Sequence, residues 1–182
     1  MWSAERGLAR YALVSHSMGG KAAQTLAARQ PQGLESLLLV APPPLSPEPM
    51  TDGGRADLRA AWGNEAAARA ALAHIARLPL SPELAGQTIA DNLRGARAAR
   101  EAWPDAGSRE DLSALASEIA VPTHILAGEC DPVSSPDLLR REVQAHCSGA
   151  TLTVAPGAGH PLPLEDADGV AGWIREMPGR GR

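Results

Sequence analysis

Three side chains that lie far apart in the sequence have the types and the order needed for nucleophilic catalysis by a serine: Ser17, Asp131 and His160. A serine hydroxyl is a poor nucleophile at neutral pH, so it needs a base that takes its proton and an acid that orients the base. We expect Ser17 to attack a carbonyl carbon, His160 to carry the proton and Asp131 to hold the imidazolium. Chemistry of this kind needs no cofactor.

The serine lies at the tip of a predicted turn between a strand and a helix. An apolar run precedes it and two glycines follow it, in the segment Tyr11-Ala12-Leu13-Val14-Ser15-His16-Ser17-Met18-Gly19-Gly20. Such a turn exposes the nucleophile on a strained backbone and requires small residues two positions before and after it. Ser15 and Gly19 occupy these positions. The segment therefore predicts a nucleophile elbow.

The acid and the base are each expected just after a strand. Residues 121–128 form a short apolar run that leads into Glu129-Cys130-Asp131-Pro132. Residues 151–155 form a second such run, followed by Pro156-Gly157-Ala158-Gly159-His160-Pro161. Because this second loop is rich in turn-forming residues, it can place the imidazole over the edge of the sheet.

Two other carboxylates compete for the role of the acid. Glu129 precedes Asp131 by two residues, and Glu48 follows the strand predicted at 34–41. Asp131 is preferred because an Asp-Pro pair directly after a strand fixes the turn that aims a carboxylate at Nδ1 of the histidine. Cys130 has no base beside it and is interpreted as a small buried apolar residue.

The other histidines are not assigned as the base. His16 is next to the serine and is a candidate for the substrate pocket. His124 falls within a strand and is expected to be a satisfied core or edge residue. His146 ends a helix, where an imidazole suits the C-terminus. No second pair of ligands stands at metal-binding spacing, so we expect no metal site.

The sequence pattern predicts an α/β fold. Residues 34–41 are a nearly continuous apolar run, typical of a strand that is buried on both faces of a parallel sheet. The order strand, helix and strand at the N-terminus predicts a right-handed crossover. The expected strands are 8–15, 34–41, 121–128 and 151–155, and the expected helices around them are 18–30, 111–119, 136–146 and 165–176.

A different pattern separates the two halves. The proline-rich segment 42–49 excludes regular structure and indicates a linker. Residues 51–108 are rich in alanine and arginine and predict helices, with Asn64 and Ser81 as N-caps. This region also contains aromatic and imidazole side chains that either line a substrate pocket or belong to the helical core: Trp62, His74 and Trp103.

With its Ser-Asp-His order, and with Gly-Glu-Cys-Asp-Pro and Gly-Ala-Gly-His around the acid and the base, the sequence resembles the α/β-hydrolase superfamily from about Leu8 to Trp173. The resemblance implies a serine hydrolase that acts on an ester or a related small acyl compound. It also implies a core at 1–44 and 109–177, a helical cap at 45–108 that selects the substrate, and a disordered tail at 178–182. Ser15 departs from the glycine that is usual at its position.

A second departure concerns the sheet. Members of the superfamily normally carry several strands before the elbow, and a loop among them donates one of two oxyanion N–H groups. The resemblance therefore implies a partial sheet that lacks the N-terminal strands, with the Met18 N–H as the remaining donor. The elbow strand would then be an apolar edge through which two copies could associate. The alternative interpretation is a non-catalytic remnant that acts at most as a binding or dimerising module.

Composition limits the partners and the cellular location that we expect. The net charge is −4, and Lys21 is the single lysine among 17 basic residues, so we expect no nucleic-acid partner. Two cysteines make no disulfide framework, and the first residues lack the apolar segment of a signal peptide. No apolar stretch is long enough to span a membrane. We therefore expect a cytoplasmic protein without membrane contact, whose partner is a small-molecule acyl substrate.

Overall fold

The computed structural model describes residue 7 and residues 9–176, so the tail predicted at 178–182 lies outside the described residues. Its centre is a sheet of four parallel strands in the order β1-β2-β3-β4. The predicted α/β fold with a partial parallel sheet is confirmed. The strands are β1 (Tyr11–His16), β2 (Leu34–Val40), β3 (Thr123–Gly128) and β4 (Thr151–Ala155).

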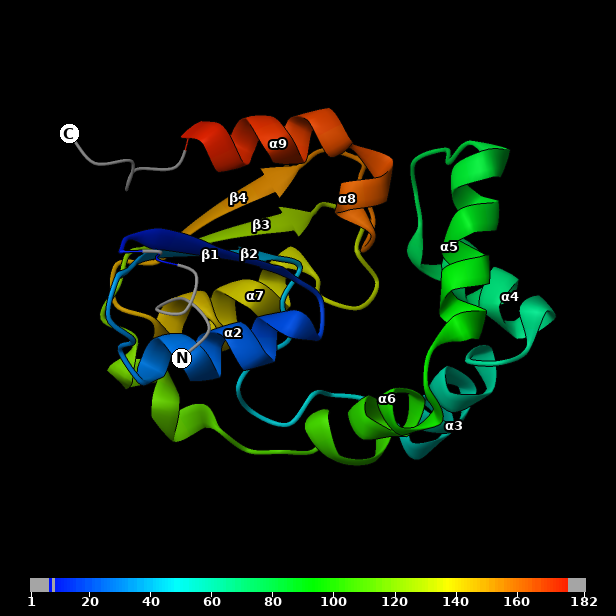
Figure 1. Cartoon of the computed structure of the whole chain (residues 1–182), viewed down its shortest axis with the longest axis horizontal. Coiled ribbons are helices and arrows are strands. Elements are labelled where there is room, and N and C mark those ends of the chain that lie inside the picture. The colour runs from blue at the N-terminus through cyan, green and yellow to red at the C-terminus, as the bar shows by residue number, and fades with distance from the viewer. Residues whose placement is uncertain (1–6, 8, 177–182) are drawn as a thin grey trace.

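Helices cover both faces of this sheet (Figure 1). Successive side chains of β2 point to opposite faces, so Leu37 packs with residues of the helices on one face and Leu38 with residues of the helix on the other. Because both faces are dry, β2 is apolar almost throughout. The first face carries α2 (Gly19–Ala28) and α7 (Pro136–Glu142), and the second carries α9 (Ala167–Glu176).

A separate group of helices lies beyond the edge of the sheet toward which the arrowheads of β3 and β4 point (Figure 1). The side chains of Thr51, Asn64 and Ser81 accept N–H groups at the starts of the first three helices, which confirms the N-caps predicted at Asn64 and Ser81. No helix of the described residues has the length and apolarity needed to cross a bilayer. The group comprises α3 (Asp52–Ala61), α4 (Glu65–Ile75), α5 (Pro82–Arg94), α6 (Arg97–Ala102) and a π-helical turn (Trp103–Gly107).

Three C-terminal helices differ in detail from their predicted ranges. The helix predicted at 136–146 is divided, because Val143 leaves helical geometry with φ −118° and ψ −59°. A 3-10 turn (Gln144–His146) then follows α7. The helix predicted at 111–119 is a 3-10 helix (Ser113–Glu118), and α9 is preceded by a separate short helix, α8 (Leu162–Glu165).

The two connections between the sheet and the group α3–α6 run side by side. The Leu112 N–H donates to the Leu45 carbonyl and the Glu48 N–H to the Ser108 carbonyl, each at 2.8 Å. Lys21 of α2 extends beneath both connections and is only 4% exposed. Its ammonium donates to the carbonyl oxygens of Ser46 at 3.3 Å, Gly107 at 3.0 Å and Glu110 at 2.6 Å. The only lysine of the chain thus joins both connections to the sheet layer.

Candidate active site

Ser17 occupies a strained turn between β1 and α2. Its φ of 50° lies in the left-handed region, which L-residues with a side chain rarely adopt. The backbone is held there by the Ser17 N–H, which donates to the Val40 carbonyl of the neighbouring strand at 3.0 Å. Strain of this kind persists only where the surrounding structure imposes it and is common at functional sites. The turn has the geometry of an elbow that presents the serine at the end of the sheet.

The two glycines that follow Met18 differ in how closely other atoms surround them. A Cβ added at Gly19 would lie 3.9 Å from the Ser15 Cβ, which is an ordinary contact. A Cβ added at Gly20 would lie 2.7 Å from the Pro42 Cβ, closer than real atoms approach. Positions 15 and 19 are therefore in contact, as predicted, although an alanine at 19 would fit. Gly20 needs to lack a side chain, because α2 packs directly against the segment that follows β2.

Gly20→Ala is expected to destabilise the protein by about 1–3 kcal/mol, as overpacking does, even though alanine favours a helix by about 1 kcal/mol over glycine. The matched control is Gly172→Ala in α9, where an added Cβ meets nothing within 4 Å. That control should stabilise the protein by about 0.5–1 kcal/mol. Urea unfolding of both variants measures the difference, and a neutral Gly20→Ala would contradict the close contact with Pro42.

The structure brings together the three residues expected to carry the chemistry. The Ser17 hydroxyl donates to Nε2 of His160 at 2.7 Å, and Nδ1–H of His160 donates to Oδ2 of Asp131 at 2.9 Å. Because an ionised carboxylate only accepts hydrogen bonds, Nδ1 carries the proton and Nε2 is free to receive one. This is the tautomer in which an imidazole can act as a general base toward a serine.

Asp131 is fixed on both of its oxygens. Oδ1 accepts the N–H groups of Val133 at 2.7 Å and Ser134 at 2.9 Å, while Oδ2 faces the imidazole. Burial raises the pKa of this carboxyl, but the hydrogen bonds from His160 and from the two backbone groups outweigh it and lower the pKa below the ordinary value. The charged form is therefore favoured, as an acid that stabilises an imidazolium requires.

The backbone of His160 is held from two sides. Its N–H donates to the Ile75 carbonyl at the end of α4, and its carbonyl accepts from Nε2–H of His16, both at 2.9 Å. Glycine at 159 permits this approach, since a Cβ there would lie 2.3 Å from the Ile75 oxygen. The Gly159 N–H donates to the Glu165 carboxylate at 2.6 Å. The base is thus positioned jointly by the sheet and by the helices beside it.

His16 was a candidate for the substrate pocket, but it does not lie among the residues that line the cavity described below. It lies behind His160 instead, with 5.4 Å between the ring centroids. Burial lowers the pKa of His16, and the nearby His160 lowers it further, although the hydrogen bond to the His160 carbonyl opposes this. The hydrogen bond that His16 makes is with the backbone carbonyl of His160.

The pKa of His16 gives a prediction for stability. A depressed pKa in the folded state means that the unfolded chain binds more protons below about pH 6.5, so His16 removes stability as the pH falls through that value. His16→Gln should therefore lose less unfolding free energy than the wild type between about pH 7.5 and about pH 5. Urea unfolding at both pH values tests this, with exposed His146→Gln as the control.

The test must compare how the unfolding free energy of the two proteins changes with pH, because Glu48 changes this free energy in the opposite direction to His16. Burial raises the pKa of Glu48, so its contribution to stability falls as the pH rises from the unfolded value to the folded one. This contribution is common to the wild type and the His16→Gln variant and cancels in the difference. Equal slopes for the two proteins would contradict the assignment to His16.

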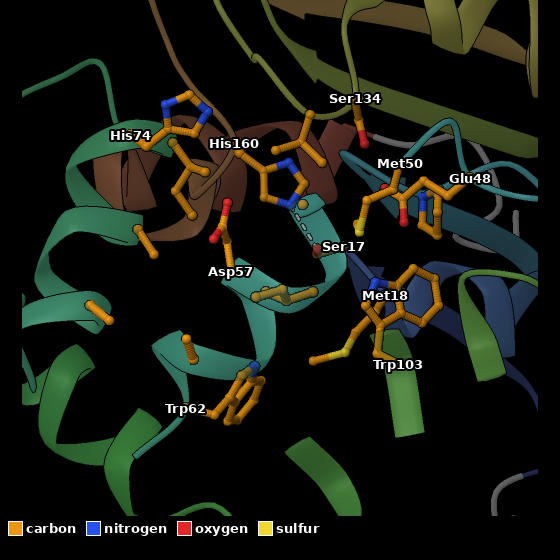
Figure 2. Close-up of a pocket in the computed structure, with 18 of the residues that line it drawn as sticks. Ser17, Met18, Glu48, Met50, Asp57, Trp62, His74, Trp103, Ser134 and His160 are labelled. Atoms are coloured by element: carbon orange, nitrogen blue, oxygen red, sulfur yellow. Dashed lines mark hydrogen bonds between the residues drawn. The ribbon is translucent and has the colours of Figure 1, made fainter. Parts of the chain in front are cut away.

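A cavity of about 710 Å³ opens beside Ser17, between the sheet and the helices α3 and α4. Ser17, Met18 and His160 line it from the sheet, and Figure 2 shows the hydroxyl and the imidazole facing it. The lining is mainly apolar, which is usual for sites that bind small molecules. The other side chains labelled in Figure 2 are Glu48, Met50, Asp57, Trp62, His74, Trp103 and Ser134.

The other residues considered in the sequence as pocket, acid or nucleophile candidates lie in different parts of the structure. Trp62 and Trp103 line the cavity, as does His74. Glu129 accepts the Gly157 N–H at 2.8 Å and does not contact His160 through any hydrogen bond of the described chain. Cys130 is exposed, so its prediction as a buried residue was wrong, because its side chain leaves the sheet at the turn after β3.

Two of the sequence expectations concern hydrogen bonding and metal binding. Nδ1 of His124 lies 2.7 Å from the Thr151 hydroxyl, as expected for a satisfied histidine in a strand. Within the described residues, no group of at least three His, Cys, Asp or Glu side chains is arranged to hold a metal ion. The backbone N–H of Met18 stands at the start of α2 and donates to no backbone acceptor of the described chain. It is therefore free to bind a ligand.

Sequence reasoning did not identify two acidic residues of the cavity wall. Glu48 was weighed only as an alternative acid, yet it lines the cavity and is 9% exposed. Asp57 of α3 also lines the cavity, and no motif in the sequence marked it. The available signal was an aspartate on a helix that also carries two arginines, which does not distinguish a cavity residue from a surface one.

Comparisons with known proteins agree with this architecture. Residues 3–173 match the model of the alpha/beta hydrolase family. The enol-lactonase from Burkholderia xenovorans LB400 superposes with a TM-score of 0.77 at 22% identity, over 96% of this chain and 68% of its own. The esterase EaEST from Exiguobacterium antarcticum gives 0.83 at 16% identity, over 96% and 68%.

A third similar structure is the carboxylesterase CesB from Bacillus subtilis, with a TM-score of 0.77 at 17% identity, covering 100% of this chain and 64% of its own. The chain thus spans about two thirds of the length of these structures. No curated protein matches the sequence. At identities of 16–22%, these similar structures show the fold alone. The family is shown by the match of the family model to residues 3–173. The chain belongs to the alpha/beta hydrolase family.

Proposed function

We propose that this protein is a serine hydrolase that cleaves an ester or a related small acyl compound through an acyl-enzyme. The observation that carries the proposal is the continuous hydrogen-bond chain from the Ser17 hydroxyl through His160 to Asp131, at 2.7 Å and 2.9 Å. Hydroxyl, imidazole and carboxylate in this arrangement are the groups that nucleophilic acyl transfer requires. The similar esterase and lactonase structures support the same class of reaction.

The steps follow from the positions of these groups. The Ser17 oxygen attacks the carbonyl carbon of the substrate while Nε2 of His160 takes the hydroxyl proton, and Asp131 stabilises the resulting imidazolium. The oxyanion receives a hydrogen bond from the free N–H of Met18. The imidazolium then protonates the leaving alcohol, and an activated water releases the acid from Ser17 by the reverse sequence. No electron transfer is involved: the proton of Ser17 leaves with the alcohol, and the proton that His160 takes from the water restores the Ser17 hydroxyl.

We also propose that the segment 45–108 acts as a cap that determines which substrates enter. Its helices α3 and α4 supply much of the cavity wall opposite Ser17. The segment is joined to the sheet layer through the paired connections that Lys21 binds, through the hydrogen bond from the His160 N–H to the Ile75 carbonyl, and through the Leu78 N–H, which donates to the Glu165 carboxylate at 2.8 Å. A cap in this position controls access and selectivity without changing the residues that react.

A fluorophosphonate reagent tests the proposal directly, because it labels a serine only when an assembled base activates it. We expect labelling of the wild type at Ser17 and none in Ser17→Ala or His160→Ala. The matched control is Ser15→Ala, two residues away, whose hydroxyl makes no hydrogen bond in the structure; it should still be labelled. Folded wild-type protein that is not labelled would contradict the proposal and support a non-catalytic binding module.

A further inference from the structure

The charged side chains that line the cavity are acidic. Glu48 and Asp57 lie in its wall, whereas none of the described lining residues is a lysine or an arginine. His74 and His160 are the other titratable groups there. A substrate that enters the cavity therefore meets carboxylates and imidazoles but no fixed cation. This distribution of charge in the wall favours substrates that are positively charged over those that are negatively charged.

Two cations near Glu48 form hydrogen bonds elsewhere. Lys21 donates to three backbone carbonyls of the paired connections. Arg55 is 5% exposed, and its guanidinium donates to the Ser108 hydroxyl at 3.2 Å, to the Glu48 carbonyl at 3.4 Å and to the Met50 carbonyl. Both side chains stabilise the connecting segments. Neither is available to pair with an anionic group of a substrate.

Asp57, in contrast, has no counter-charge in the described chain. Its neighbours on α3 are neutralised, since Asp52 pairs with Arg109 at 2.6 Å and Arg59 pairs with Asp105 at 2.8 Å. Asp57 takes part in no ion pair among the described residues. Figure 2 shows its carboxylate pointing from α3 into the space that the His160 imidazole also faces. An acidic group is thus presented to the ligand without a protein partner.

Two indole rings also line the cavity. Trp62 follows α3 directly, Trp103 begins the π-helical turn, and both line the cavity. The face of an indole attracts a cation, most strongly when the cation is partly removed from water. An acidic side chain combined with aromatic faces favours organic ammonium groups over neutral groups of the same shape. The same combination repels carboxylates.

We propose that the cavity selects a substrate whose non-reacting end is an organic ammonium, with Asp57 as its counter-ion and Trp62 and Trp103 as apolar faces. This rests on the proposed function only in that Ser17 would cleave the ester bond of the same molecule. Asp57 is a specificity-determining residue here, since it contacts the substrate away from the reacting atoms. Because it is exposed to water, its effect falls as salt concentration rises.

Binding tests the proposal without requiring turnover. The probes are butyrylcholine and its uncharged isostere 3,3-dimethylbutyl butyrate, titrated into the Ser17→Ala protein by calorimetry. We expect the cation to bind about five- to tenfold more tightly than the isostere. Introducing Asp57→Asn should remove most of this preference, whereas Asp52→Asn, on the same helix but outside the cavity, should leave it within about twofold of its original value. High salt should reduce it.

The outcomes separate the two proposals. Equal binding of cation and isostere, or a preference that Asp57→Asn and Asp52→Asn reduce equally, would overturn the ammonium proposal, because the effect would be absent or would not come from the cavity. Wild-type hydrolysis of the same esters and of p-nitrophenyl butyrate reports on the serine hydrolase proposal. Selective binding with no hydrolysis and no serine labelling would contradict the hydrolase and leave an ammonium-binding site. Hydrolysis without a preference for the cation would support the hydrolase and contradict the ammonium site.

Discussion

Asp131→Asn is expected to lower kcat toward p-nitrophenyl butyrate by about 10⁴-fold while leaving the fold intact. The asparagine oxygen can still accept the N–H groups of Val133 and Ser134, which now bind Oδ1. Its amide nitrogen, however, replaces an acceptor by a donor opposite Nδ1 of His160. The imidazole must then carry its proton on Nε2, where it cannot accept the proton of Ser17.

The control for this variant is Glu129→Gln. Glu129 is two residues away and accepts the Gly157 N–H, which a glutamine oxygen can also accept. Its kcat should stay within about twofold of the wild type, since Glu129 does not contact the imidazole. Steady-state kinetics measure both variants, and circular dichroism verifies their folding. A loss of less than about tenfold in Asp131→Asn would assign the acid to another carboxylate, and Glu48→Gln would then be the variant to examine.

Lys21→Met is expected to lower the free energy of unfolding by about 3 kcal/mol, because three carbonyl oxygens in a buried position lose their donor. Methionine retains most of the side-chain length, so the loss comes from polar contacts rather than from a cavity. Burial lowers the pKa of Lys21, and the nearby Glu110 and Glu48 oppose that shift. The ammonium is therefore partly stabilised by these carboxylates.

Arg10→Met provides the comparison for Lys21→Met. Arg10 forms an exposed ion pair with Glu35 of β2, and removing such a pair costs about 0.5 kcal/mol or less. Urea unfolding gives the two free energies, and limited proteolysis should show faster cleavage within 42–50 or 107–111 in Lys21→Met alone. If both variants lose the same small amount, Lys21 does not join the connections as the structure indicates.

The proximity of Ser17, Asp131 and His160 could be predicted from the sequence because each residue depends on a local signal. The apolar run before Ser17, the turn formers before His160 and the Asp-Pro pair at Asp131 each indicate a strand end, and the ends of parallel strands meet at one edge. The N-caps at Asn64 and Ser81 are similarly local. These features required no knowledge of distant contacts.

The supporting contacts could not be predicted in the same way. The Ile75 carbonyl that holds His160 and the Pro42 ring that excludes a side chain at Gly20 depend on how separate elements pack. The set of residues that line the cavity also depends on how separate elements pack. Helix α3 carries charged residues at four of its ten positions, and its sequence does not reveal that Asp57 rather than Asp52 faces the site. Helix rotation is decided by tertiary packing, which a pattern of polar residues does not encode.

The paired connections beside Lys21 have an evolutionary consequence. Since the chain leaves the sheet and returns to it at neighbouring points, the whole segment between them can be exchanged for another of different length without reordering any strand. Such an exchange would replace the acidic and aromatic side chains of the cavity wall, while Ser17, Asp131 and His160 stay with the sheet. A substituted segment would have to provide one acceptor in the place of the Ile75 oxygen. Selectivity and reactivity can thus diversify at different rates within one ancestral scaffold.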